Sequence, residues 1–168
     1  MIYRLPEIGD KEILQAYVQE HHDCKETSIS ASMGLLSSEY SDWVEMIQKN
    51  ASIGDALWGK SLLYLCFDEN KLIGLLSIRY ELSQSLTPKY GDIGYGVRPS
   101  ERKKGYATRM LQYALSVCKE KGKDKVVLGC YKDNPASAAT IRKNGGVLIE
   151  ENSNYADGKV SQYYLVNL

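Results

Sequence analysis

The chain has 168 residues, 43% of them hydrophobic, and its 21 basic residues balance its 21 acidic residues to a formal net charge of zero. This length suits one domain with a buried core of ordinary size. The zero net charge argues against a broad electrostatic surface for nucleic acid.

Cysteine spacing and hydropathy exclude further classes of protein. The four cysteines form no C-x-x-C pair and fit neither a zinc site nor a small disulfide framework, so we expect free thiols. No stretch reaches about 18 consecutive apolar residues, and the opening residues MIYRLPEIGDKEI lack the apolar run of a signal peptide. We therefore expect a cytoplasmic protein that has no membrane span.

The first third of the chain predicts one strand and two helices. Residues 2–5 indicate a short strand, and the helical spacing of apolar residues that follows Asp10 predicts a helix capped by this residue. A second helix is predicted over 38–50. The segments 25–37 and 51–60 are rich in Ser or Gly and indicate loops.

The middle of the chain changes to strand patterns. Two apolar runs between residues 61 and 82 flank the polar residues 68–71, which is typical of a hairpin. Gly74 inside the second run indicates a bulge or a close approach of backbones. A third strand is predicted over 92–97, and Pro99 follows it.

The last third alternates strands and helices. The run GYATRMLQYALSVCKEK, residues 105–121, has an apolar stripe at helical spacing and predicts the longest helix. A buried-type strand, KVVLGCY, comes next, and Asn134 with Pro135 opens another helix. The segments VLIEE and VSQYYLVNL predict two closing antiparallel strands that turn through Asp157 and Gly158.

This element order predicts the fold class. It runs β-α-α-β-β-β-α-β-α-β-β, which indicates an α/β (α+β mixed) protein with a single domain over residues 1–168. A strand-helix-strand unit between hairpins predicts a mixed, mostly antiparallel seven-stranded sheet with a central parallel pair and about four helices.

The stretch RPSERKKGYATRML places three cations, Arg102, Lys103 and Lys104, directly before Gly105 and a helix. The first N–H groups of a helix are unpaired and attract anions. Glycine allows a ligand to approach the backbone, and the hydroxyl of Thr108 adds a donor. Solvated surface charge is the alternative reading, but the position between strand and helix favours a diphosphate site.

Two common phosphate motifs are excluded. No G-x-x-x-x-G-K-[ST] string is present, and Gly94-Tyr95-Gly96 lacks the third glycine of a dinucleotide fingerprint. The run R-K-K-G-Y-A resembles the [QR]-x-x-G-x-[GA] signature of the GNAT superfamily of N-acetyltransferases, and V-R-P upstream also fits. A second family motif, N-x-x-[SA]…K-x-G, is matched by Asn134, Ser137, Lys143 and Gly145.

The resemblance implies acetyl-CoA as co-substrate, bound between two splayed parallel strands at 92–97 and 125–131. The backbone amides of 103–108 would hold the pyrophosphate, and the amide of Tyr95 or Gly96 would polarise the thioester carbonyl. The cofactor-binding residues implied are Tyr95, Gly96, Val97, Arg102, Lys103, Lys104, Gly105, Tyr106, Ala107, Thr108, Asn134 and Ser137.

The reaction implied is direct attack of a neutral amine on the thioester, and it needs a base because a primary amine has a pKa of about 10. Asp92 is the first candidate, before an expected bulge in its strand, and Glu81 is the second. Many members carry a Tyr acid seven positions after the motif Asn, where this chain has Ile141. Tyr131 is the substitute candidate, although a CoA thiolate can leave without a dedicated acid. Asp92 as a solvated turn residue and Tyr131 as a packed aromatic are the structural alternatives.

The acceptor stays open at this point. A small-molecule amine, a protein N-terminus and a lysine all fit, with loops 25–37, 51–60 and 83–90 around the acceptor site. We expect no nucleic-acid partner because the net charge is zero, and no membrane partner because no long apolar stretch is present. We expect no metal because the neighbours His21 and His22 point in different directions on a helix. The C-terminal strands offer an edge for a homodimer. A non-catalytic acyl-CoA-binding sensor module is the alternative function, supported by the missing Tyr.

Overall fold

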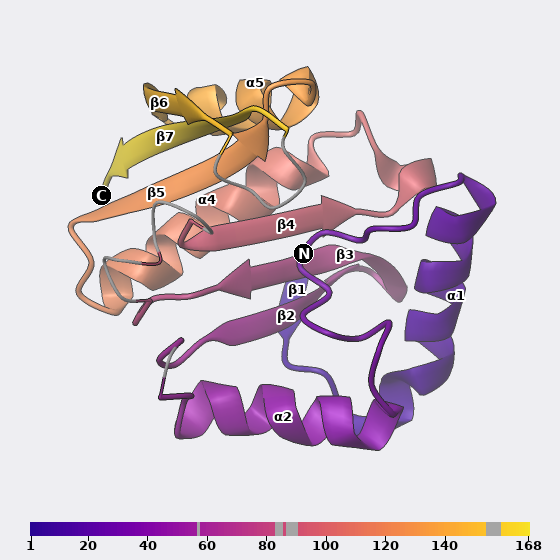
Figure 1. Cartoon of the computed structure of the whole chain (residues 1–168). Coiled ribbons are helices and arrows are strands. Elements are labelled where there is room, and N and C mark those ends of the chain that lie inside the picture. Colours follow the sequence, from indigo (N-terminus) through magenta and orange to yellow (C-terminus); the bar gives the residue numbers. More distant parts are fainter. Residues whose placement is uncertain (57, 83–85, 87–90, 154–158) are drawn as a thin grey trace.

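The computed structural model describes residues 1–56, 58–82, 86, 91–153 and 159–168. Its elements follow the predicted order (Figure 1). They are β1 (Ile2–Arg4), the 3-10 turn η1 (Ile8–Asp10), α1 (Lys11–Asp23), α2 (Tyr40–Ser52), β2 (Leu62–Asp68), β3 (Lys71–Ile78), β4 (Ile93–Val97), the 3-10 turn η2 (Pro99–Glu101), α4 (Tyr106–Glu120), β5 (Lys125–Tyr131), α5 (Pro135–Lys143), β6 (Val147–Asn152) and β7 (Ser161–Asn167).

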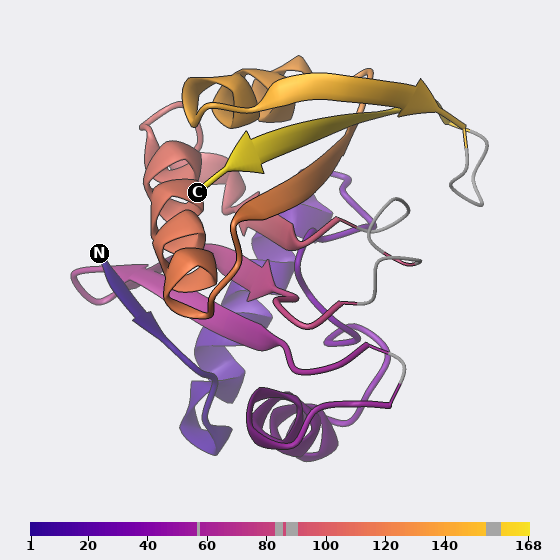
Figure 2. The ribbon, with the colours of Figure 1, turned by 90° about the vertical axis from the view of Figure 1, so that its left-hand side faces the viewer.

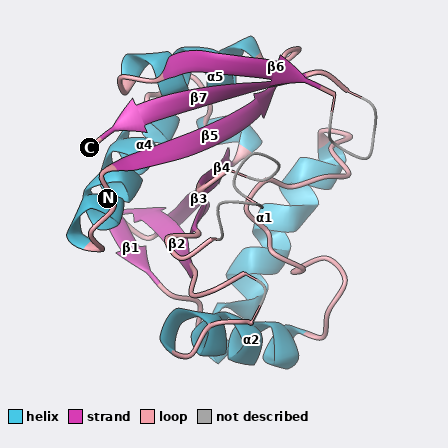
Figure 3. Cartoon of the chain, turned by 60° about the vertical axis from the view of Figure 1, so that its left-hand side comes forward, coloured by secondary structure: helices cyan, strands magenta, loops and turns pink. Residues whose placement is uncertain are grey.

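The strands form two antiparallel sheets in place of the single seven-stranded sheet that was predicted. One sheet has the order β1-β2-β3-β4 and the other has the order β5-β7-β6 (Figure 3). Strands β4 and β5 lie next to each other and point the same way (Figure 1), but no ladder joins them in the described residues. A backbone hydrogen bond joins them at one end, where Asp92 N donates to Val127 O at 2.7 Å.

The helices cover both faces of the strands. Helices α4 and α5 pack on one face, and α1 and α2 pack on the other (Figure 2). The first core includes Met110, Leu111 and Ala114 of α4, and residues of both sheets contribute to it. The second core is built around Tyr17 and Trp43. Because α4 backs both sheets, it holds β4 and β5 in place although they are not paired along their length.

Both alternatives predicted for Gly74 are present. The register of β2 and β3 shifts from Cys66–Gly74 to Phe67–Leu72, which is an irregularity next to Gly74, and the glycine also permits a close approach between β3 and β4. A Cβ atom built at Gly74 would lie 2.2 Å from the carbonyl oxygen of Gly96. The register runs without a shift from Gly74–Val97 to Ile78–Ile93, so the bulge expected in the strand at 92–97 is absent from β4.

Substitution of Gly74 tests this contact. We expect Gly74→Ala to lower the free energy of unfolding by about 3 kcal/mol, because a backbone oxygen has little room to move away from the added methyl group. Urea denaturation measures the loss. Gly122→Ala is the comparison, since its Cβ would meet nothing within 4 Å and the cost there comes from the φ of +80° alone. Equal losses in the two variants would contradict the packing argument.

The closing strands β6 and β7 pair antiparallel as predicted, while the turn proposed at Asp157 and Gly158 lies outside the described residues. No helix in the described part of the chain is both long enough and apolar enough to cross a bilayer.

Candidate active site

Strand β4 presents alternate backbone groups to the two neighbouring strands. Arg98 N donates to Ile73 O at 2.8 Å, and Ser77 Oγ donates to Gly94 O at 3.4 Å, so the even-numbered residues turn their backbone groups toward β3. Because this direction alternates along an antiparallel strand, Tyr95 and Val97 turn theirs toward β5. Of the two amides predicted to polarise a carbonyl, only that of Tyr95 therefore faces the side of β5.

The side chains of β4 also divide between its faces. The Tyr95 hydroxyl lies 2.9 Å from Ser137 Oγ of α5, and burial raises the pKa of Tyr95 to about 12. On the other face, Gly94 and Gly96 have no side chains, so β4 itself does not cover its backbone there. A Cβ at Gly96 would lie 2.9 Å from the carbonyl oxygen of Ser30, so the segment between α1 and α2 rests directly on the strand.

The loop after β4 ends at the N-terminus of α4. Gly105 is the cap residue with φ of +82°, and a Cβ there would meet nothing within 4 Å. The first N–H groups of a helix have no helical partner, and Gly105 has no side chain that could cap them. The predicted diphosphate site therefore has unpaired amide donors, and the position of its cap residue is open.

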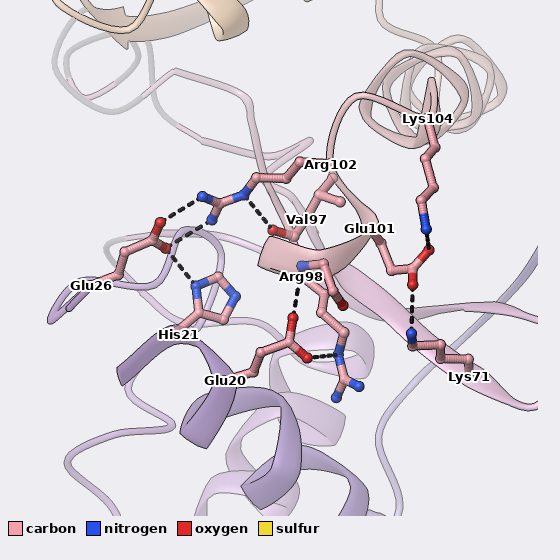
Figure 4. A network of polar contacts seen from close by, with 10 residues as sticks. Glu20, His21, Glu26, Lys71, Val97, Arg98, Glu101, Arg102 and Lys104 are labelled. Atoms are coloured by element: carbon pink, nitrogen blue, oxygen red, sulfur yellow. Dashed lines mark hydrogen bonds and ion pairs between the residues drawn. The ribbon is translucent and has the colours of Figure 1, made fainter. Parts of the chain in front are cut away.

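Two of the three predicted cations are paired with carboxylates (Figure 4). Arg102 binds both oxygens of Glu26, at 2.5 and 2.8 Å, and its Nε donates to Val97 O at 3.1 Å. Lys104 Nζ donates to Glu101 at 2.9 Å, and Lys71 shares the same carboxylate. The two ammonium groups hold the pKa of Glu101 below its usual range. Lys103 is exposed.

Comparison with known proteins shows the family of the chain. Residues 30–145 match the model of the acetyltransferase (GNAT) family. The chain belongs to this family. The matched segment contains β4, the loop with Gly105, and α5, so it covers the site described above except for Glu26.

Solved structures share the fold of this acetyltransferase at low sequence identity. An acetyltransferase from Salmonella typhimurium that modifies the N-terminal serine of ribosomal protein L7/L12 is 20% identical, with a TM-score of 0.71 over 99% of this chain and 94% of that chain. A spermidine N-acetyltransferase chimera of the Vibrio cholerae SpeG protein and hSSAT is 17% identical, with a TM-score of 0.67 over 99% and 96%. The microcin C7 self-immunity acetyltransferase MccE, solved with acetyl-CoA and AMP, is 20% identical, with a TM-score of 0.70 over 99% and 91%. A comparison with curated proteins gave no significant match.

Asp92, the first candidate base, is 2% exposed and lies directly before β4, where its backbone bonds to β5. One carboxylate oxygen accepts from Lys123 Nζ at 2.7 Å, and the other accepts from Val127 N at 2.7 Å. Together with Asp92 N and Val127 O, these bonds tie the two sheets together. Both oxygens are engaged, which favours a structural role over proton transfer.

The other two candidates lie apart. Glu81 follows β3 at the same end as Asp92, and its carboxylate accepts from Lys60 N at 3.0 Å. Tyr131 ends β5 at the opposite end, level with Val97, and Lys159 Nζ lies 5.1 Å from its ring centre. The structure therefore does not bring the predicted base and the predicted acid together.

The departures from the family motif on α5 compensate for each other. Ile141, which stands where many members have Tyr, is fully buried in the core. In many members a Phe follows the K-x-G part of the motif, where this chain has Gly146. A Cβ at Gly146 would lie 2.4 Å from Ile141 Cγ2, so this glycine makes room for the isoleucine.

Asn134 caps α5 as predicted, because its Oδ1 accepts from Ser137 N at 3.1 Å. We expect Asn134→Ala to lower the free energy of unfolding by about 1 kcal/mol, which is the usual loss for a cap. Asn134→Asp keeps the capping oxygen and should preserve stability. If the side chain also lines a cofactor site, the aspartate variant raises the KM for acetyl-CoA, whereas an unchanged KM would limit Asn134 to capping.

Sequence reasoning missed the acidic partners in this site. Glu26 and Glu101 bind the cations, and Lys123 binds Asp92. The spacing of Glu101 and Lys104, three residues apart, is the one local signal that could have revealed a pair. His21 bonds to Glu26, and the described residues contain no group of three metal-ligating side chains.

Proposed function

We propose that this acetyltransferase moves an acetyl group from acetyl-CoA to a primary amine. The diphosphate would bind the amides of residues 103–108, and the pantetheine arm would run between β4 and β5, pairing with the edge groups of Tyr95 and Val97. The observation that carries the proposal is the start of α4, where Gly105 leaves open space before unpaired amides at the end of β4.

The chemistry requires little from side chains. The amine nitrogen forms a bond to the acetyl carbon, the carbon–sulfur bond breaks, the nitrogen loses a proton, and the CoA thiolate leaves. The Tyr95 amide would stabilise the negative charge on the carbonyl oxygen, and one such donor contributes about 3 kcal/mol. With both oxygens of Asp92 engaged, we propose Glu81, which lies at the same end of the strands, as the base that takes the proton through water. Because Tyr131 lies at the opposite end, we propose that the CoA thiolate leaves without a dedicated acid.

The acceptor belongs to the class of small amines or of protein N-termini and lysines, since structural neighbours include enzymes for spermidine and for an N-terminal serine.

We propose that residues 1–168 form one catalytic domain. The four free cysteines fit a reducing compartment, for which we propose the cytoplasm. We also propose a homodimer through the C-terminal strands, because β6 carries exposed Val147, Leu148 and Ile149; size-exclusion chromatography tests this.

A thiol-release assay tests the function. The panel contains a polyamine, free amino acids, a peptide that begins with serine and a peptide with an internal lysine. We expect release of CoA with at least one of them. Uptake of acetyl-CoA in calorimetry without turnover across the panel would favour the sensor alternative, which is supported by the absence of a Tyr at position 141.

A further inference from the structure

Glu26 connects three parts of the molecule through one carboxylate. It lies in the segment between α1 and α2, accepts from His21 Nδ1 of α1 at 2.7 Å, and binds Arg102 of the loop before α4 with both oxygens (Figure 4). Arg102 and Glu26 are 76 positions apart in the sequence. The hydrogen bonds of Arg102 and His21 lower the pKa of Glu26 to about 2, so the carboxylate is ionised at neutral pH.

Arg102 lies across the end of β4 in this arrangement. Its Nε donates to the carbonyl oxygen of Val97, one of the groups that turn toward β5 and with which a pantetheine arm would pair. The same segment that carries Glu26 places Ser30 O against Gly96, on the bare face of the strand. One ion pair therefore joins the edge of the proposed cofactor site to the segment that covers the other face of β4.

We propose that Glu26 is a positioning residue that acts through Arg102 and lowers the affinity for acetyl-CoA until the cofactor displaces it. This exchange rests on the proposed function. The diphosphate draws the guanidinium of Arg102 away from Glu26, and Val97 O becomes free to pair with the pantetheine arm. Segment 24–37 then loosens over Gly96.

Charge and exposure support such an exchange. The side chains of Arg102 and Glu26 are 44% and 32% exposed, and an ion pair in contact with solvent is weak enough to be replaced by a more highly charged anion. Glu26 would also repel a diphosphate at the start of α4. When Arg102 leaves, the carboxylate keeps the N–H of His21, so the exchange does not leave a buried charge without a partner.

The first test is the affinity for CoA, measured by calorimetry. We expect Glu26→Gln to bind CoA about fivefold more tightly than the unaltered protein, because the competing charge is gone. Glu26→Asp should stay near the original affinity. Glu20→Gln is the matched control: Glu20 bonds to Ser100 N and pairs with Arg98 in the same network, but it does not contact Arg102. A variant that merely disturbs the fold loses affinity, so a gain is specific.

Two further measurements complete the test. In an Arg102→Gln background, Glu26→Gln should no longer change the affinity for CoA. Hydrogen exchange of residues 24–37 should rise when CoA binds, and should already be high in Glu26→Gln without CoA. Unchanged or weaker CoA binding by Glu26→Gln, or exchange that does not respond to CoA, overturns this inference alone. Absence of CoA uptake by the unaltered protein overturns the proposed function and this inference with it.

Discussion

Replacement of Gly105 by glutamate is expected to weaken CoA binding at least about 100-fold, whereas Gly105→Ala weakens it by less than about fivefold. Both variants carry the strain of an L-residue at φ of +82°, which costs about 1 to 2 kcal/mol. Only glutamate adds a charge. Its carboxylate can reach the unpaired amides of α4 and occupy the place of the diphosphate.

Calorimetry with CoA measures both affinities, and thermal denaturation shows whether the variants are folded. Alanine serves as the matched control because a Cβ at this position meets nothing within 4 Å. If the glutamate variant took up CoA as well as the alanine variant, the start of α4 would not be the diphosphate site.

Asp92→Asn is expected to lower the free energy of unfolding by about 3 kcal/mol. The substitution removes the partner of Lys123, whose side chain is only 20% exposed, and it weakens the bond from Val127 N. Urea denaturation measures the loss. At temperatures where the variant is folded, its rate of acetyl transfer should stay within about threefold of the original rate.

A double-mutant cycle separates the contributions. Lys123→Gln should cost less than Asp92→Asn, since Lys123 is the more exposed partner, and the double variant should lose less than the sum of the two. The opposite pattern, with stability preserved and turnover abolished in folded Asp92→Asn, would return Asp92 to the role of base.

Local signals made much of the element order predictable. The strand at Lys125–Tyr131 and the cap at Asn134 were predicted correctly from a short apolar run and from an Asn-Pro pair. Each of these signals depends on a few neighbouring residues. The four described helices and the hairpin at 62–78 follow for the same reason, because periodicity and turn residues act over short distances.

The division into two sheets required information that the local sequence does not carry. Whether β4 and β5 form a ladder depends on how far apart the packing on α4 holds them, and the contacts of Asp92 with Lys123 and Val127 are 31 and 35 positions apart. The choice of Asp92 as candidate base meets a related limit, because it depended on a bulge in its strand that the continuous register of β3 and β4 excludes.

The cations at 102–104 show the same limit for the site. Their position before Gly105 predicted where an anion would bind, which the open start of α4 supports. Their availability was not predictable, because the carboxylate that holds Arg102 comes from a distant segment.

The bonds between Asp92 and Val127 tie the two sheets together at one end of β4 and β5. If β5, β7 and β6 tilted about this tie, the distance between β4 and β5 would change little there and more with each further residue, which spans about 3.3 Å along β4. The outer margin lies at Val97 and Tyr131, five and four positions beyond the tied residues Asp92 and Val127. If the sheets tilt about this tie, the spacing between β4 and β5 changes most at Val97 and Tyr131 and least at Asp92, so the diphosphate end of the proposed cofactor site would tolerate more bulk than the end at Asp92.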